Sequence, residues 1–241
     1  MKIMELFQKK SQDLQGAQPV TLAFLGDSVT QGCFEVYEND SGNLEPIFDV
    51  ASAYHSYLKQ LLTMLYPSVP INIINAGISG DGAPGGLKRL ERDVLKYHPD
   101  FTVVCFGLND CGKGVGNMKE YTDALSGIFS ELKKAEIETV FMTPNMMNTK
   151  ISCHLKEAGL REVAKTTMEL QKHGVLEHYL DQARKVCSQY QIPICDCYLD
   201  WIKMDEMGID ITNHLSNYIN HPTRQMNWLF SIRLLEKMLY E

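Results

Sequence analysis

The chain has 241 residues, of which 44% are hydrophobic and 22% charged, so it can bury a sizeable core. Its net charge of −7 argues against nucleic acid and anionic membranes as partners, because both attract basic surfaces. The N-terminus lacks the apolar segment of a signal peptide, and no apolar run approaches the ~20 residues of a membrane span. These features predict a cytoplasmic protein.

The seven cysteines also point to a reducing compartment. Their number is odd, and no C-x-x-C pair occurs among them. We therefore expect buried free thiols rather than a disulfide framework. No metal-ligand spacing is found in the sequence, so neither a metal nor a cofactor is expected.

Predicted helices and strands alternate along the chain. Residues 1–18 form a polar lead-in segment with a helix. Apolar runs typical of buried strands occur at residues 20–25, 71–75, 101–106, 139–142 and 192–195. Helical spacing of apolar residues predicts helices at residues 50–65, 84–97, 118–132, 175–190, 196–207 and 223–240.

Two segments have no clear period. Residues 33–48 contain several turn formers, which favours a long loop. Residues 145–170 are polar and irregular, with helix in part. Neither segment has the composition of a linker, so residues 1–241 are expected to form a single domain.

Five alternations of strand and helix predict a parallel sheet with helices on both faces. The expected fold is α/β with three layers and a five-stranded sheet in the flavodoxin-like order 2-1-3-4-5. In that order the first and third strands flank the point at which ligands bind.

Glycines and polar residues follow the first three predicted strands. Gly26, Asp27 and Ser28 follow the first, Gly77 follows the second, and Asn109 follows the third. The carboxyl ends of parallel strands meet at one edge of the sheet, so Ser28 and Asn109 should face the same crevice. The alternative for Ser28 is a simple cap of a turn or helix.

A serine nucleophile needs a base, since its hydroxyl is weakly nucleophilic. Among seven histidines, His221 lies in a loop before the last helix and is followed by Pro222, so its side chain can project over the sheet edge. His98 is explained as a cation at the end of a helix.

The blocks Gly26-Asp27-Ser28, Gly77, Gly107-x-Asn109-Asp110 and His221-Pro222 together resemble the SGNH (GDSL-type) hydrolases. The resemblance spans residues 20 to about 235. It implies a three-layer α/β/α fold and hydrolysis of a small-molecule ester. It also implies Ser28 as nucleophile and His221 as base, with an oxyanion hole formed by Ser28, Gly77 and Asn109.

One position departs from the pattern of that family. An aspartate three residues before the histidine usually completes a triad, but here that position is Tyr218. A phenol is a poor substitute for a carboxylate that orients an imidazole. A backbone carbonyl, Asn217 or Asp210 could orient His221 instead.

Other interpretations of the sequence stay open. Ser79 is a competing nucleophile, because residues 77–81 partly resemble the G-x-S-x-G elbow of α/β-hydrolases. An acyltransferase or thioesterase of the same fold is an alternative, because any acceptor can resolve an acyl-enzyme. A catalytically weakened binding module is another, since the aspartate is missing.

The two segments without a period are expected to shape the substrate pocket. They contain aromatic and polar residues that would suit a sugar ester, namely Phe34, Tyr37, Asn39, Phe48, Asn145 and Asn148. We therefore expect an esterase for small esters, with acetyl esters of carbohydrates as one class. No pattern in the sequence bears on the oligomeric state.

Overall fold

The computed structural model describes residues 1–240. At its centre is a sheet of five parallel strands in the order β4-β1-β5-β6-β7. The strands are β1 (Val20–Gly26), β4 (Ile71–Gly77), β5 (Phe101–Cys105), β6 (Glu138–Met142) and β7 (Ile194–Cys195). Counted along the chain, this is the order 2-1-3-4-5, so the predicted fold class is confirmed.

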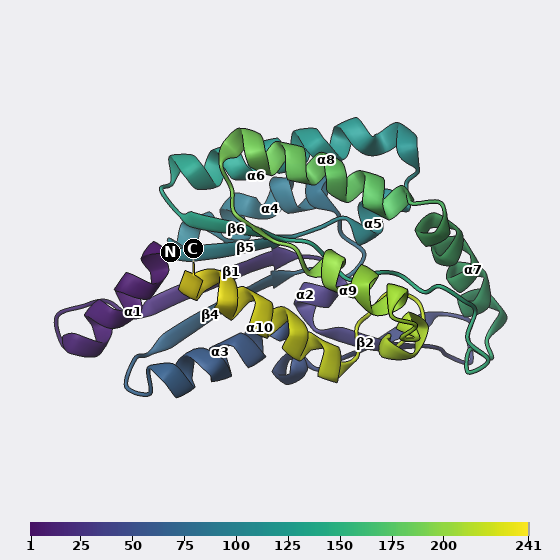
Figure 1. Ribbon diagram of the computed structural model, residues 1–241, viewed down its shortest axis with the longest axis horizontal. Helices are drawn as coiled ribbons and strands as arrows, with labels where there is room; N and C mark the ends of the chain where they lie inside the picture. The colour runs from purple at the N-terminus through teal and green to yellow at the C-terminus, as the bar shows by residue number, and fades with distance from the viewer. Residues whose placement is uncertain (241) are drawn as a thin grey trace.

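Helices cover both faces of the sheet, which gives three layers (Figure 1). One layer contains α4 (Ala83–Asp93), α6 (Met118–Lys134) and α8 (Val175–Tyr190), and the other contains α1 (Lys2–Gln12), α3 (Tyr54–Leu65) and α10 (Arg224–Tyr240). Within the layers, α6 packs against α4 and α8, and α10 packs against α3. The shorter helices α2 (Ser28–Gln31), α5 (Leu108–Cys111) and α9 (Cys197–Glu206) follow β1, β5 and β7.

The core lies between the sheet and these helices. Every residue of β5 is buried, as a continuous apolar run predicts for a strand covered on both faces. The helix α6 buries one stripe of apolar residues spaced three or four apart, namely Tyr121, Ala124, Leu125, Ile128, Phe129 and Leu132. The core is therefore built from the continuous apolar strands and the amphipathic helices that the sequence predicts.

Residues 33–48 form a β-hairpin, so the prediction of a loop was wrong. Its strands are β2 (Cys33–Glu38) and β3 (Leu44–Phe48), paired antiparallel. The side chain of Asn39 closes the turn by accepting hydrogen bonds from the backbone N–H groups of Ser41 and Asn43. All five residues of β3 are exposed, so no alternation of buried and exposed residues marks the strand in the sequence.

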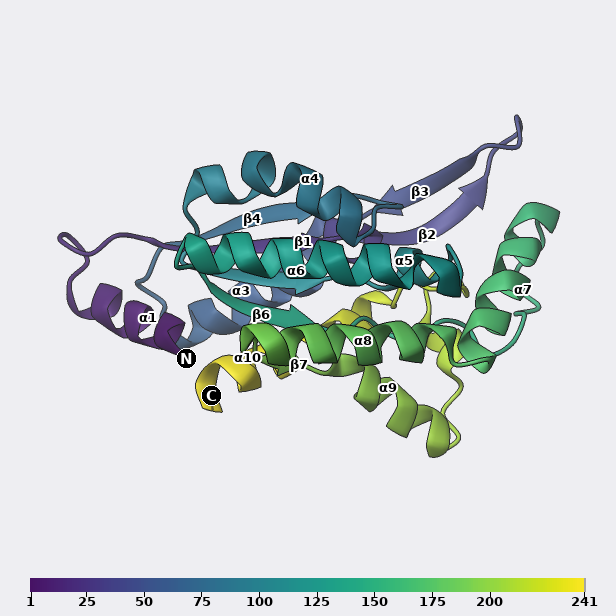
Figure 2. The same ribbon diagram turned by 90° about the horizontal axis from the view of Figure 1, so that it is seen from above.

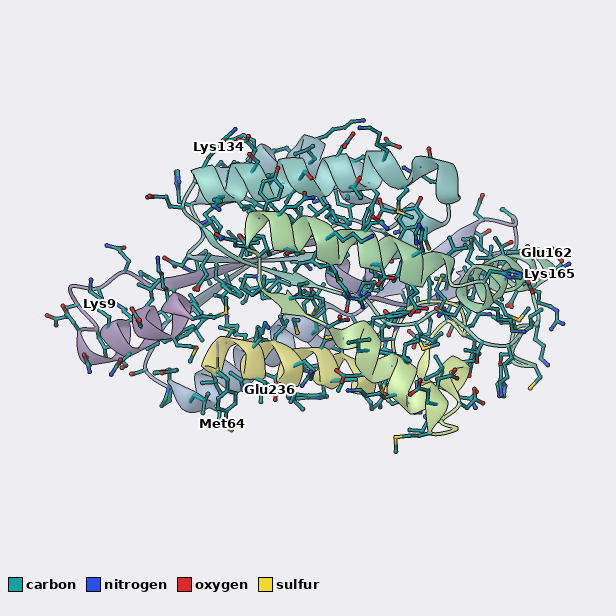
Figure 3. The ribbon with its side chains drawn as sticks, turned by 45° about the horizontal axis from the view of Figure 1, so that its top comes forward. Lys9, Met64, Lys134, Glu162, Lys165 and Glu236 are labelled. Carbon is teal, nitrogen blue, oxygen red and sulfur yellow. The ribbon has the colours of Figure 1, made fainter. Side chains whose placement is uncertain are left out.

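The segment at residues 145–170 is partly helical, as expected. Its first half is irregular, and α7 (Ala158–Lys172) follows. Figure 2 shows α7 and the hairpin extending from the same end of the molecule, opposite to the two chain ends. Figure 3 shows Glu162 and Lys165 of α7 pointing outward at that end. The hairpin, which is a separate two-stranded sheet, and α7 therefore project from the same end of the molecule (Figure 2).

A small apolar cluster joins α7 to the loop that precedes α10. It consists of Leu155, Leu160, Ala164 and Ile219, and Val36 of β2 packs against it. The hairpin, α7 and the loop before α10 are thus in contact, although they are far apart in the sequence.

All seven cysteines are free, and six of them are buried. This confirms the expectation of buried free thiols, with Cys153 as the exposed exception. Among residues 1–240, no helix has the length and apolar character that crossing a membrane requires.

Arg89 of α4 links the ends of two neighbouring strands. Its side chain is 7% exposed and donates to the carbonyls of Gly26 (2.9 Å) and Ala76 (2.6 Å), which lie at the ends of β1 and β4. It also pairs with Asp81 in the loop after β4, with 2.7 Å between Nε and Oδ2. One buried cation therefore holds three backbone segments at the carboxyl edge of the sheet.

We expect Arg89→Met to lower the free energy of unfolding by about 3–5 kcal/mol, because it leaves two carbonyls and a carboxylate without their cation. Urea denaturation measures this change. The matched control is Arg92→Met on the same helix, where the guanidinium is 67% exposed. It should change stability by less than about 0.5 kcal/mol. Equal effects of the two substitutions would contradict the role given to Arg89.

Candidate active site

Ser28 is the first residue of α2 and lies directly beyond the end of β1. Asp27 caps this short helix, because its Oδ1 accepts a hydrogen bond from the Val29 N–H at 3.0 Å. The cap thus belongs to Asp27, and the hydroxyl of Ser28 takes no part in it. Ser28 is 3% exposed, so it is almost completely shielded from solvent.

His221 lies against Ser28, as the sequence predicts for a base and its nucleophile. The distance between His221 Nε2 and Ser28 Oγ is 3.0 Å, although 193 residues separate the two. The imidazole is 6% exposed. The loop before α10 therefore carries His221 over the carboxyl edge of the sheet, where β1 ends.

The other imidazole nitrogen of His221 is held by a backbone carbonyl. Nδ1 lies 2.9 Å from the carbonyl oxygen of Phe34 in β2. A carbonyl can only accept a hydrogen bond, so Nδ1 carries the proton and Nε2 is left to accept one from Ser28. The backbone carbonyl, one of three alternatives left by the sequence, is the group that orients His221.

The other candidate partners of His221 have different roles. Asp210 accepts hydrogen bonds from Lys150 and Asn213. Asn217 Oδ1 accepts from backbone N–H groups, including that of His221 at 3.0 Å, and so shapes the loop rather than the imidazole. Tyr218 stacks its ring on that of His154, with 5.3 Å between the ring centroids.

Burial controls the charge of the imidazole. It lowers the pKa of His221 from 6.5 to about 4, and the Phe34 carbonyl and the charge of Glu35 oppose this shift only in part. At neutral pH the imidazole is therefore uncharged and free to accept a proton.

Asn109 lies in the first turn of α5, directly after β5. One N–H of its side-chain amide donates to the carbonyl of Asp81 at 2.8 Å. This bond fixes the orientation of the amide and leaves its second N–H for another acceptor. The arrangement suits a donor to a substrate oxygen.

The backbone N–H of Gly77, which was expected to be a free donor in an oxyanion hole, already makes a hydrogen bond. It donates to Asn75 Oδ1 at 3.0 Å. A Cβ at this position would lie 2.2 Å from the backbone nitrogen of Gln31. The glycine therefore lets β4 pack closely against α2, and its N–H already has a partner within the chain.

Gly80 is the glycine of this loop whose N–H is unoccupied. It has φ +78° and lies in a turn closed by the hydrogen bond from Asp81 N–H to the Ile78 carbonyl at 3.1 Å. Within the described residues, the Gly80 N–H has no hydrogen-bond partner, and the space around its Cα is open. The sequence does not single out Gly80, because several glycines share the loop. Its place in a turn that demands a positive φ was the available signal.

Ser79, the competing nucleophile, is exposed on the same loop. Its N–H donates to Gln31 Oε1 at 2.7 Å, and among the described residues no histidine contacts its hydroxyl. In the described part of the chain, an imidazole thus lies against the hydroxyl of Ser28 and none lies against that of Ser79.

Two buried carboxyl groups support the loops that carry Ser28 and Asn109. Asp110 Oδ1 accepts a hydrogen bond from the Ala83 N–H at 3.0 Å and so caps α4. Burial raises the pKa of Asp110 to about 6 and that of Asp27 to about 7. Like the imidazole, both groups are shifted toward their uncharged forms.

The NMR titration of the His221 imidazole should have its midpoint near pH 4. The folded protein then binds fewer protons than the unfolded chain between about pH 6.5 and 4, so this group lowers stability as the pH falls through that interval. Histidine Cε1–H signals report the titration, and His221→Asn assigns the signal. A midpoint near 6.5 would show that the imidazole is not buried.

Comparisons with known proteins agree with the fold. The sequence matches the GDSL-like Lipase/Acylhydrolase family over residues 24–229. It is 28% identical over 132 residues to an acetylxylan esterase from Geobacillus stearothermophilus, across 51% of this chain and 58% of that protein. The match therefore spans little more than half the length of this relative.

Solved structures extend the likeness to most of the chain. A crystal structure of an acetyl xylan esterase, AlAXEase, has a TM-score of 0.65 at 19% identity and covers 91% of this chain and 100% of its own. The Geobacillus stearothermophilus acetylxylan esterase has a TM-score of 0.66 at 18% identity, with 92% and 95% covered. A gut microbial diltiazem-metabolizing enzyme has a TM-score of 0.67 at 17% identity, with 91% and 46% covered. By the family match, which spans most of its length, the chain belongs to the GDSL-like lipase/acylhydrolase family.

Proposed function

We propose that the protein is a serine esterase that hydrolyses small carboxylic esters through an acyl-enzyme on Ser28. The observation that carries this proposal is the chain of contacts from Ser28 Oγ to His221 Nε2 and from His221 Nδ1 to the Phe34 carbonyl. It joins a nucleophile, a base and a group that orients the base, which are the three elements of acyl transfer by serine.

In the first step His221 accepts the proton of Ser28 while Oγ attacks the ester carbonyl. The imidazolium then donates that proton to the leaving alkoxide, and the acyl group stays on Ser28. In the second step a water molecule gives its proton to His221 and attacks the acyl-enzyme. The imidazolium then returns the proton to Ser28 Oγ as the bond to the acyl group breaks, and the carboxylic acid leaves. The tautomer set by the Phe34 carbonyl places an acceptor at Nε2 for each of these steps.

The negative charge on the substrate oxygen needs donors that are already in place. The proposed donors are the backbone N–H of Ser28 and the second N–H of the Asn109 amide. From the loop after β4 we assign Gly80, because serving as a donor would require the Gly77 N–H to leave Asn75. One such donor contributes about 3 kcal/mol of transition-state stabilisation.

Acetyl esters of carbohydrates are the proposed substrate class. Two relatives are acetylxylan esterases, and the nucleophile of this chain is closely enclosed. Of the residues expected to line the pocket, Phe34, Asn145 and Asn148 are buried. Tyr37 and Phe48 are exposed on the hairpin, so these two aromatic side chains remain available to a sugar.

A cytoplasmic location is part of the proposal. It is supported by the seven free thiols, six of them buried without a disulfide, which suit a reducing compartment.

Replacing the nucleophile tests the proposed function directly. Ser28→Ala should lower hydrolysis of p-nitrophenyl acetate by at least about 10⁴-fold, because no acyl-enzyme can form. Ser79→Ala is the matched control, since it removes a serine hydroxyl from an exposed turn of the neighbouring loop, and it should keep wild-type turnover. Activity retained in Ser28→Ala would overturn the assignment. Release of acetate from acetylated xylooligosaccharides, compared with acetyl to octanoyl p-nitrophenyl esters, defines the substrate class.

Substitution of Tyr218 tests whether its phenol takes part. The Phe34 carbonyl already occupies His221 Nδ1, so Tyr218→Phe should keep kcat within about threefold of the wild type. Steady-state hydrolysis of p-nitrophenyl acetate measures the effect. A loss of about 100-fold in this variant, with an unchanged melting temperature, would show that the hydroxyl serves the reaction.

A further inference from the structure

The Phe34 carbonyl is available to His221 because β2 contains a bulge. Cys33 pairs with Phe48, and the next pair along the hairpin is Val36 with Pro46. Two residues of β2, Phe34 and Glu35, therefore stand opposite a single residue of β3. A bulge releases backbone groups from the ladder and changes the direction in which they point. Here it directs a carbonyl toward the imidazole.

The hairpin needs a further constraint to hold this carbonyl in place. All of β3 is exposed, and β2 is buried only at its first two residues. A two-stranded ribbon with few buried contacts is marginally stable by itself. A neutral carbonyl on such a ribbon would orient an imidazole less firmly than a carboxylate on the histidine loop.

Arg224, the first residue of α10, contacts β2 and the residue that directly follows β3. Its Nη1 and Nη2 donate to the two carboxylate oxygens of Glu35 at 2.6 and 3.1 Å. Its Nε donates to Asp49 Oδ2 at 2.8 Å, just beyond β3. The guanidinium also lies over the Phe34 ring, with 4.4 Å between Cζ and the ring centroid. The Arg224 side chain thus contacts the hairpin on both sides of the bulge. It also contacts Phe34, the residue whose carbonyl accepts the hydrogen bond from His221.

Arg224 is also close to His221 in the sequence. It lies three residues after His221, so the same short segment carries the imidazole and the side chain that holds its acceptor. Hydrogen bonds from Arg224 keep the pKa of Glu35 and Asp49 below their usual values, so both carboxylates are charged. The charge of Glu35 favours the protonated form of His221.

We propose that Arg224 is a positioning residue, which holds the bulge of the hairpin so that the Phe34 carbonyl takes the place of the aspartate absent at position 218. The inference rests on the proposed function, because it concerns how His221 is oriented as a base. Glu35, held in place by Arg224, supplies the negative charge near the imidazolium.

The first test is kinetic. Arg224→Gln should lower kcat for p-nitrophenyl acetate by about 10- to 100-fold, because a small displacement of a positioned group has a cost of this order, while KM changes less than about threefold. Arg224→Lys should recover part of the loss, since an ammonium replaces the charge and not the two-pronged contact with Glu35. Asp49→Asn keeps the contact with Glu35 and should lose less activity than Arg224→Gln.

The matched control is Arg233→Gln on the same helix. Arg233 pairs with Asp200 and Glu236, and within residues 1–240 no hydrogen bond or ion pair joins it to the hairpin. The Arg233→Gln substitution removes ion pairs from α10 but leaves the contacts around the Phe34 carbonyl in place. This variant should therefore keep wild-type kcat, whatever its effect on melting temperature. A kcat for Arg224→Gln within about twofold of the wild type, or equal losses in both variants, would overturn the proposal.

A spectroscopic test separates this inference from the proposed function. The Nδ1–H of His221 should give a low-field proton resonance, assigned by its absence in His221→Asn, and lose it in Arg224→Gln but not in Arg233→Gln. Persistence of the resonance in Arg224→Gln would overturn the positioning role. Wild-type protein that hydrolyses no ester, yet shows this pattern, would refute the esterase function alone. If Arg224→Gln does not fold, Asp49→Asn decides by the same resonance, which should broaden if the proposal holds and stay unchanged if it fails.

Discussion

The hydrogen bond from His221 Nδ1 to the Phe34 carbonyl is the interaction on which the candidate site depends. It sets the tautomer, and the tautomer makes Nε2 an acceptor for the Ser28 hydroxyl. Without it, the contact between His221 and Ser28 would have no preferred direction of proton transfer. A hairpin that contributes little to the core therefore supplies the group that orients His221.

The rest of the site follows from the parallel sheet. Strands β1, β4 and β5 end at one edge, and the loops beyond them carry Ser28, Gly80 and Asn109. Arg89 donates hydrogen bonds to the ends of both β1 and β4, so it fixes the strand ends from which these loops begin. The loop before α10 then brings His221 over this edge. Three strand ends and one distant loop thus meet at the same edge of the sheet.

Burial also changes the pKa values of the ionisable groups at this edge of the sheet. It favours the uncharged forms of His221, Asp27 and Asp110, all of which lie next to the reacting groups or support them. In the proposed reaction, a negative charge that develops on a substrate oxygen would be stabilised by oriented N–H dipoles. Dipoles fixed in a setting of low dielectric stabilise such a charge more strongly than water does.

The pairing of Ser28 with His221 was implied by the resemblance to the SGNH hydrolases. The sequence pattern by itself determined a parallel sheet covered by helices and placed Ser28 at its carboxyl edge, because buried strands and amphipathic helices leave distinct apolar patterns and parallel strands end at one edge. It also indicated Asn109, a polar residue at the end of a buried strand. The hairpin at residues 33–48 was decided only in the tertiary structure, since a strand exposed on both faces has no period. The Phe34 carbonyl was likewise invisible, because every residue has a carbonyl and only packing decides which one faces an imidazole. The choice between Gly77 and Gly80 depended on hydrogen bonds formed by side chains of other residues, which glycine spacing cannot encode.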